Sequence, residues 1–283
     1  MWPSFQTRVS GKWVLAGEHS VLHGATAIAL PHPEFTLNLS FQPSSTELSV
    51  EPKSSHTMIS DLFRAVEDER ALDDLPISKP EGTLHLSSTI PMGAGLGSSA
   101  ALCVALTRWM AEPLSISSQD FFEFARRLEH RFHGRSSGMD IAVILENEAI
   151  SFNLEKGSLP LGIRTLPRFT FHDTGLRKRT SDAVFQVENF REEKPWLALQ
   201  TDEAMSSAAR FGIEGLERYH LGDADAGLRL IANAMSQAQE CFYTWGLIPR
   251  EIKNLEEDLR AQGALGVKIT GAGGGGFLVA LWK

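Results

Sequence analysis

The clearest chemical pattern in this chain is a glycine-rich segment, Pro91–Ala101, which reads PMGAGLGSSAA. Gly93, Gly95 and Gly97 alternate with other residues, and two serines follow before an apolar run that stops at Pro113. Glycines let the backbone approach an anion, and the first N–H groups of a helix lack partners within it. The pattern predicts a phosphate-binding loop that opens a helix, and the alternative is a tight turn with a serine cap.

Two common phosphate motifs do not fit this segment. A P-loop has Lys directly after its last glycine, whereas Ser98 follows Gly97 here. The dinucleotide fingerprint requires the spacing G-x-G-x-x-G, which the alternating glycines do not match. The segment is therefore either a third kind of nucleotide loop or a turn.

Two carboxylates follow this segment at positions suited to catalysis or metal binding. Glu129 lies beside the apolar stripe of a predicted helix, where a carboxylate needs a partner. The local candidates for a salt bridge are Arg126, Arg127 and Arg131. Asp140 precedes the apolar run 141–145, where a carboxylate either caps a helix or serves as the base for a hydroxyl group.

Near the N-terminus, Lys12 lies in an otherwise apolar stretch. Burial of a lysine is costly unless it faces a cleft, and the alternative is an edge-strand lysine that faces water. His19 and His23 are four residues apart, but no third ligand is near them. We therefore expect hydrogen-bonding histidines in a turn and not a zinc site.

A second glycine-rich segment, Gly271–Gly276, contains five glycines in six positions. A hairpin turn needs only two such residues, so the excess indicates a backbone that passes close to something bulky. The alternative is a flexible turn.

The composition is that of a globular protein, with 42% hydrophobic and 22% charged residues in 283. The net charge of −8 argues against nucleic acid or an anionic membrane as partner. The chain has neither a signal-peptide pattern nor an apolar run long enough for a membrane span. With only two cysteines, Cys103 and Cys241, a structural disulfide is not expected. We expect a cytoplasmic protein, either a monomer or a homodimer.

The elements that must position these residues follow from hydrophobic periodicity. Strands are predicted over 9–16 (interrupted at Gly11), 26–30, 34–41, 47–51, 83–88, 168–172, 267–270 and 277–282. Helices are predicted over 55–72, after 98, after 120 with its end at Gly134, and over 180–190, 196–219, 224–243 and 249–262, with a loop at 74–82. This irregular mixture indicates an α+β fold in two parts, with the break near 158–167.

In their order along the chain, three segments resemble the motifs of the GHMP kinases, which phosphorylate galactose, homoserine, mevalonate and phosphomevalonate. These segments are Gly11–His19 (GKWVLAGEH), Pro91–Ala101 and Lys268–Gly276 (KITGAGGGG). Residues 133–143 (HGRSSGMDIAV) resemble the catalytic stretch of the family. Met92 and Ser136 depart from the pattern, since each stands where proline is frequent.

The resemblance implies a two-domain α+β fold. Residues 1–162 would form an N-terminal domain, a mixed sheet with helices that binds nucleotide and Mg²⁺. Residues 163–283 would form a ferredoxin-like, helix-rich domain that completes the substrate pocket. The implied activity is ATP-dependent phosphorylation of the mevalonate hydroxyl, in isoprenoid precursor synthesis. Alternatives are another acceptor (phosphomevalonate, homoserine or a sugar) or a non-catalytic binding protein. A phosphorylated acceptor would need extra cations, which Arg177, Lys178 and Arg179 offer.

The resemblance also implies roles for individual residues. Asp140 would be the catalytic base, with Lys12 beside it near the acceptor hydroxyl. Ser99 and Glu129 would hold Mg²⁺ against the phosphates of ATP. The residues expected to bind the nucleotide are Pro91, Gly93, Ala94, Gly95, Leu96, Gly97, Ser98, Ser99 and Ala100. Those expected to line the acceptor pocket are Glu18, His19, Ser137, Thr180, Gly271 and Ala272.

Overall fold

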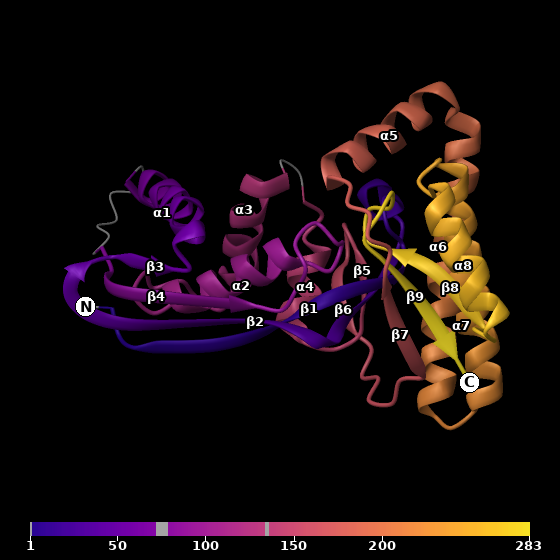
Figure 1. Ribbon diagram of the computed structural model, residues 1–283, viewed down its shortest axis with the longest axis horizontal. Coiled ribbons are helices and arrows are strands. Elements are labelled where there is room, and N and C mark those ends of the chain that lie inside the picture. The colour runs from indigo at the N-terminus through magenta and orange to yellow at the C-terminus, as the bar shows by residue number, and fades with distance from the viewer. Residues whose placement is uncertain (1, 72–78, 134–135) are drawn as a thin grey trace. The chain divides into compact units, whose positions relative to one another are not determined.

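The computed structural model describes residues 2–71, 79–133 and 136–283 (Figure 1). The chain forms two compact units, each assembled from separate segments. Unit 1 comprises Met1–Gly11, Pro33–Ile90 and Ser98–Leu145, and unit 2 comprises Lys12–His32, Pro91–Gly97 and Glu146–Lys283. These units alternate along the sequence, whereas the predicted domains 1–162 and 163–283 are continuous; that domain boundary stays a prediction.

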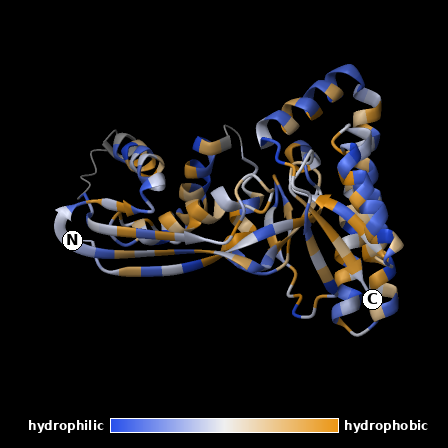
Figure 2. Ribbon diagram, viewed as in Figure 1, coloured by the Kyte–Doolittle hydropathy of each residue, from blue (hydrophilic) through white to orange (hydrophobic). Residues whose placement is uncertain are grey.

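Unit 1 contains a mixed sheet. The later part of β2 (Ala27–Glu47) pairs antiparallel with β4 (Glu81–Ser88), and β3 (Ser49–Glu51) runs parallel to β4. β1 (Phe5–Ala16) pairs with β2. Along β2, Leu37, Leu39 and Phe41 are buried while Asn38 and Gln42 are exposed, an alternation that Figure 2 shows as changing colour along the strands. One face of this sheet is therefore available for a hydrophobic core.

Helices cover that apolar face. Unit 1 contains α1 (His56–Ala71), α2 (Ser98–Met110), α3 (Phe121–His133) and nearly all of α4 (Met139–Glu146), with the short 3-10 helix η2 at Lys53–Ser55. The ring of Trp109 in α2 lies 5.0 Å from Phe41, 5.2 Å from Phe63 and 4.8 Å from Trp2. This aromatic cluster fixes α2, the helix that follows the first glycine-rich segment, against the sheet.

Unit 2 contains two groups of strands. The start of β2 pairs with β5 (Ile150–Asn153), which pairs with β6 (Gly157–Pro160). A separate antiparallel sheet has the order β7-β9-β8, with bounds Arg168–Asp173, Phe277–Trp282 and Gly266–Thr270. Trp13, near the end of β1, packs against Phe169 and Phe171 of β7 at 4.8 and 5.5 Å. This contact joins the N-terminal strand to the C-terminal sheet within unit 2.

The other elements of unit 2 are mainly helices. They are η1 (Ser20–His23), α5 (Thr180–Glu193), α6 (Pro195–His220), α7 (Ala224–Thr244) and α8 (Arg250–Ala261). A Cβ atom on Gly215 of α6 would lie 3.0 Å from the carbonyl oxygen of Gly227 in α7. The two helices therefore run with their backbones in close contact, as Figure 1 shows.

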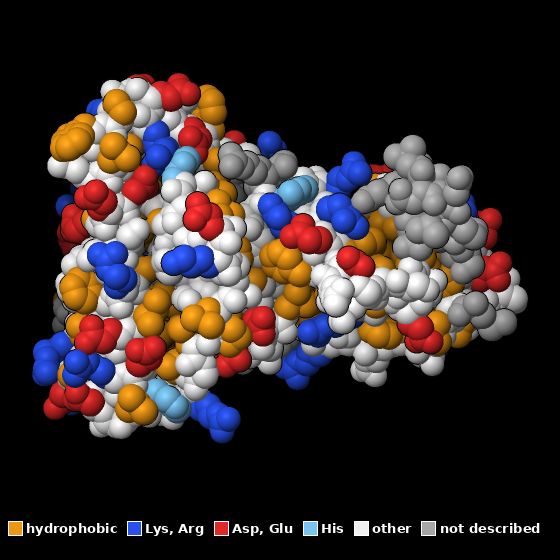
Figure 3. Space-filling view, turned by 180° about the vertical axis from the view of Figure 1, so that it is seen from behind, with side chains coloured by type: hydrophobic (Ala, Val, Ile, Leu, Met, Phe, Trp, Pro, Cys, Tyr) orange, Lys and Arg blue, Asp and Glu red, His pale blue; other side chains and the backbone are white. Residues whose placement is uncertain are grey.

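Exposed apolar residues occur at the junction of α5 and α6. Phe185, Trp196 and Leu199 are more than half exposed, and Figure 3 shows apolar side chains over these helices at its upper left. No helix in the described parts of the chain is long and apolar enough to cross a bilayer.

The predicted helices agree closely with the structure, and the differences lie mainly in the strands. Gly11 does not interrupt β1, and the two strands predicted on either side of Pro31 and Pro33 are one continuous strand, β2. Neither proline lies in the registers that pair β2 with β4 or β5, so neither has to donate a backbone hydrogen bond in those pairings. The short strands β5 and β6 were not predicted. Part of the predicted loop 74–82 and the predicted helix end at Gly134 lie outside the described residues, while residues 81 and 82 belong to β4.

Candidate active site

The first glycine-rich segment is a loop from Pro91 to Gly97, and α2 begins directly after it at Ser98, as predicted. Gly93, Gly95 and Gly97 have φ values of 68°, 76° and 75°. Only glycine adopts this left-handed conformation without a steric penalty, so the alternating glycines are a backbone requirement. The result is a loop whose chain enters a helix N-terminus, the arrangement that suits an anion.

Lys12 lies directly against this loop. Its N–H donates to the carbonyl oxygen of Leu96 at 3.0 Å, and a Cβ on Gly97 would lie only 2.7 Å from its Cγ. The lysine is only 4% exposed, so it is not the water-facing edge residue of the alternative interpretation. The positions of the lysine and of the loop therefore depend on each other.

The second glycine-rich segment is crowded by other parts of unit 2. A Cβ on Gly271 would lie 2.6 Å from the Cα of Gly95, and one on Gly276 would lie 2.5 Å from the carbonyl oxygen of Ala94. A Cβ on Gly274 would overlap the side chain of Lys178. The bulky neighbour predicted for this segment is therefore, at these positions, the protein itself, including the first glycine loop.

His19 links the N-terminal motif to the second glycine segment. Its Nε2 lies 2.9 Å from the carbonyl oxygen of Ala272. Because a carbonyl oxygen only accepts, Nε2 carries the proton, and in the neutral ring Nδ1 is an acceptor. Burial lowers the pKa of His19 to about 4, which keeps the ring neutral at pH 7. The ring can therefore accept a hydrogen bond from a hydroxyl group.

Glu18 is held by a lysine that the sequence analysis did not single out. The Nζ of Lys268 donates to Oε1 of Glu18 at 2.5 Å and to the carbonyl oxygens of Val14 and Ile269. Both side chains are buried, and burial raises the pKa of Glu18 and lowers that of Lys268, while their mutual attraction opposes both shifts. The sequence signal that could have identified Lys268 is a charged residue in an otherwise apolar strand, β8, which ends directly before a glycine-rich segment.

Two of the unit 1 candidates, Glu129 and Ser137, are linked by hydrogen bonds to the segment that leads into α4. Glu129 in α3 is 2% exposed, and the hydroxyl of Ser136 donates to its carboxylate. The N–H of Gly138 donates to Ser136 Oγ at 3.1 Å, and the N–H of Met139 donates to Ser137 Oγ at 3.2 Å. Ser136, a departure from the family pattern, thus orients the carboxylate expected to bind Mg²⁺.

Asp140 and Ser99 each lie in the first turn of a helix. Asp140 is the second residue of α4 and is partly buried, and Ser99 is the second residue of α2. A carboxylate in a first turn interacts favourably with the positive end of the helix dipole.

The segment before α5 lies on the second glycine segment. The N–H of Gly276 donates to the carbonyl oxygen of Leu176 at 2.9 Å, and α5 begins at Thr180. Arg177 makes two hydrogen bonds of 2.7 Å to Asp173, and Lys178 donates to Gln186 at 2.6 Å. Two of the three candidate cations for a phosphorylated acceptor, Arg177 and Lys178, are thus engaged with protein partners.

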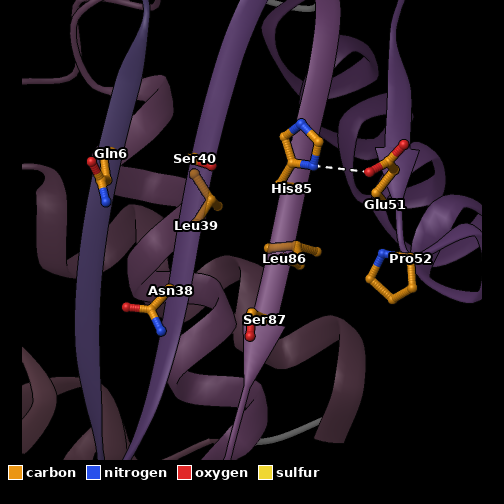
Figure 4. Close-up of a pocket in the computed structure, with 9 residues that line it drawn as sticks. All are labelled: Gln6, Asn38, Leu39, Ser40, Glu51, Pro52, His85, Leu86 and Ser87. Atoms are coloured by element: carbon orange, nitrogen blue, oxygen red, sulfur yellow. Dashed lines mark ion pairs between the residues drawn. The ribbon is translucent and has the colours of Figure 1, made fainter.

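A groove of about 490 Å³ in unit 1 contains none of the predicted site residues. It lies on polar side chains of neighbouring strands, including Asn38, Ser40 and Ser87, and His85 pairs with Glu51 at 3.0 Å (Figure 4). The groove is an open sheet surface, and the chemistry predicted from the sequence does not involve it.

The side chains present are compatible with Mg²⁺ that is bound together with phosphate groups. Among the described residues there is no cluster of three or more His, Cys, Asp or Glu side chains that could hold a metal alone. Mg²⁺ commonly takes one or two protein oxygens and completes its shell with phosphates and water. The Glu129 carboxylate and the Ser99 hydroxyl are ligands of that kind.

Comparison with known proteins identifies similar chains. The mevalonate kinase of Aeropyrum pernix is 34% identical over 208 residues, which cover 71% of this chain but 61% of that protein, less than two thirds of its length. The mevalonate kinase of Thermococcus gammatolerans is 29% identical and the match covers 95% of this chain and 86% of that protein. The crystal structure of L. major mevalonate kinase in complex with R-mevalonate has the same fold, with a TM-score of 0.75 at 22% identity over 98% of this chain and 86% of that one.

Two family models match this chain. The GHMP kinases N terminal domain matches residues 59–147, which include α2, Glu129 and Asp140. The GHMP kinases C terminal model matches residues 221–283, which include Lys268 and the second glycine segment. Together with the left-handed glycines of the loop before α2, these matches show that the chain belongs to the GHMP kinase family.

Proposed function

We propose that this chain transfers the terminal phosphate of ATP to the hydroxyl of mevalonate, giving 5-phosphomevalonate and ADP. The observation that carries the proposal is the loop Pro91–Gly97, which has three left-handed glycines, packs against Lys12 and Gly271, and leads into α2. The relatives in Aeropyrum pernix and Thermococcus gammatolerans, both named mevalonate kinase, support the choice of acceptor.

In this proposal the nucleotide phosphates bind the loop and the first turn of α2. The residues concerned are Pro91, Gly93, Ala94, Gly95, Leu96, Gly97, Ser98, Ser99 and Ala100. The backbone N–H groups of these residues, apart from Pro91, which has none, and the positive end of the helix dipole favour the negative charge of the phosphates. Mg²⁺, when bound, neutralises charge on the transferred group, and Glu129 and Ser99 are its proposed protein ligands.

Asp140 and Lys12 are the proposed catalytic residues. Phosphoryl transfer needs alignment and charge neutralisation more than covalent help. Asp140 would accept the proton of the acceptor hydroxyl as that oxygen attacks the phosphorus. The positive charge of Lys12 would favour the ionised form of the acceptor hydroxyl.

The acceptor would be bound by the N-terminal motif and the second glycine segment. Neutral His19 offers Nδ1 to a hydroxyl, because its Nε2 is used by Ala272. The other proposed acceptor residues are Glu18, Ser137, Thr180, Gly271 and Ala272. Arg177 and Lys178 are paired with Asp173 and Gln186, which favours an acceptor without a phosphate group.

An acceptor panel with coupled detection of ADP tests the proposal. We expect turnover with mevalonate and not with phosphomevalonate, homoserine or galactose. Asp140→Asn should lower kcat by about 10²–10⁴-fold, because it removes the base. Asp225→Asn is a matched control, since Asp225 is an exposed carboxylate in the first turn of α7.

Each other outcome rejects a defined part of the proposal. Turnover with a different acceptor rejects mevalonate. Binding of ATP without turnover of any acceptor rejects catalysis and favours a binding protein on the same fold. Equal activity of Asp140→Asn and the control rejects Asp140 as the base.

A further inference from the structure

One carboxylate in unit 2 is shared by donors from two other elements. Oδ1 of Asp202, on α6, accepts a hydrogen bond of 2.7 Å from the hydroxyl of Ser20 in η1. Its Oδ2 accepts a hydrogen bond of 2.5 Å from Nη1 of Arg191 in α5. The arginine and aspartate side chains are only 20% and 16% exposed, so solvent screens this pair less than a surface pair.

Ser20 directly follows His19, whose backbone is in an unusual conformation. His19 has φ 57° and ψ −54°, which lies outside the regions that residues with a Cβ commonly adopt. Such a conformation persists only where the surrounding structure holds it. On one side, the imidazole of His19 is bonded to Ala272; on the other, the fully buried side chain of Ser20 is bonded to Asp202.

A second contact joins the same 3-10 helix to α5. Nε2 of His23, the last residue of η1, lies 3.0 Å from Oε1 of Glu188. α5 begins at Thr180, and η1 directly follows His19. The contacts of η1 with α5 and α6 therefore link the positions of these two predicted acceptor residues within unit 2. The two acceptor residues are thus connected through side chains that were not predicted to bind substrate.

We propose that Asp202 is a positioning residue for the acceptor, which holds η1 through Ser20 and α5 through Arg191 and so aligns His19 with the acceptor hydroxyl. This inference rests on the proposed kinase function. Asp202 itself carries out no step of phosphoryl transfer. Its effect should fall on the acceptor and not on ATP, because the loop that is proposed to bind the phosphates makes none of these hydrogen bonds.

Steady-state kinetics of Asp202→Asn separates the two substrates. We expect KM for mevalonate to rise about tenfold, as for the loss of one charged hydrogen bond, with KM for ATP changed less than about twofold. The matched control is Glu214→Gln, on the same helix, where an exposed carboxylate pairs with Arg218 at 2.9 Å and touches no predicted site element. This control should leave both KM values unchanged.

Two further measurements support the test: a second variant in the same contact, and a hydrogen-exchange readout that does not depend on catalysis. Ser20→Ala should act in the same direction, and the Ser20→Ala/Asp202→Asn double variant should be no worse than Asp202→Asn, because both changes remove the same contact. Amide hydrogen exchange over residues 17–24 should become faster in Asp202→Asn and stay unchanged in Glu214→Gln.

The outcomes distinguish this inference from the proposed function. If the parent enzyme prefers another acceptor, mevalonate is rejected as substrate, and KM for that acceptor takes its place in the comparison. Unchanged hydrogen exchange over residues 17–24 overturns the positioning role even if the protein has no activity. Equal rises in both KM values, or a loss of thermal stability alone, also overturn it.

Discussion

The two glycine-rich segments of unit 2, Pro91–Gly97 and Gly271–Gly276, contain similar residues but differ in how closely other atoms pack against their glycines. A Cβ added to Gly93 would have no atom within 4 Å, whereas one added to Gly271 would overlap the backbone of Gly95. Both glycines have positive φ values, 68° and 89°. At Gly93 glycine is needed for its conformation alone, and at Gly271 it is needed for both conformation and close packing.

This difference indicates different roles for Gly93 and Gly271, while Gly95 and Gly97 of the first segment are themselves crowded by Gly271 and Lys12. Open space beside a left-handed glycine lets a ligand approach the backbone, as the proposed phosphate site requires. The second segment instead supports the first, because its glycines pack on Ala94 and Gly95. It is anchored by Lys268 in β8 and by the bond from His19 to Ala272. The following predictions test this division between a binding loop and a supporting loop.

The largest effect is expected from removing the anchor of the supporting loop. Lys268→Met leaves the buried carboxylate of Glu18 without its partner, and breaking a buried pair in this way costs about 3–5 kcal/mol of unfolding free energy. Urea denaturation measures the loss. Lys253→Met is the control, because Lys253 forms an exposed pair with Glu257 at 3.9 Å and should change stability by less than about 0.5 kcal/mol.

A double variant adds a check on the cause of that loss. Glu18→Gln/Lys268→Met removes both charges, so it should be more stable than Lys268→Met alone. If Lys268→Met were as stable as Lys253→Met, the anchoring role of the ion pair would be wrong.

An intermediate effect is expected from adding a methyl group to each loop. Gly271→Ala should cost about 2 kcal/mol or more, because it combines a left-handed backbone with overlap on Gly95. Gly93→Ala should cost only about 1–2 kcal/mol, since it has the conformational penalty alone. Gly93→Ala should nevertheless raise KM for ATP while leaving KM for the acceptor unchanged. Equal losses of stability in the two variants would remove the distinction between the loops.

A gradual effect, spread over several pH units, is expected from the buried histidines. The pKa of His19 is lowered to about 4 by burial, so between pH 6.5 and 4 the unfolded chain binds a proton that the folded chain does not. The free energy of unfolding should therefore fall as pH falls through this window, by up to about 1.4 kcal/mol per pH unit for this residue. His32, whose pKa burial also lowers to about 4, adds a similar slope.

Urea denaturation of His19→Asn at several pH values isolates the contribution of His19, which is bonded to the supporting loop, to the pH dependence of the unfolding free energy. Asparagine tolerates positive φ and does not titrate in this range, so the slope should become shallower while the His32 contribution remains. Identical slopes in the parent and in His19→Asn would contradict the expected titration of His19.

Much of the fold could be predicted from the sequence because it depends on local patterns. Helix periodicity and the following proline gave the extent of α2, and the predicted starts of α5 and α7 coincide with those observed. The strands were harder to predict. Proline breaks most strands, but β2 continues through Pro31 and Pro33, which lie between its pairings with β5 and β4.

The site was predicted to a smaller extent. The motifs identified the residue types, and the structure places Lys12 and both glycine segments together within unit 2. The residues that hold these groups, Lys268, Asp202 and Ser136, were not assigned such roles. Their hydrogen-bond partners are not part of any sequence motif. A serine or an aspartate in a helical protein is also common at positions without a functional role.

The sequence by itself determined the family, the phosphate-loop pattern and the main helices, because backbone conformation and periodicity are properties of short segments. Only the tertiary structure decided that Lys268 neutralises Glu18, 250 positions away, and that the last glycines pack on the first glycine loop. The physical reason is that a buried charge or a residue without a side chain is explained by its neighbours in space. Those neighbours are chosen by the packing of the whole unit and not by the adjacent sequence.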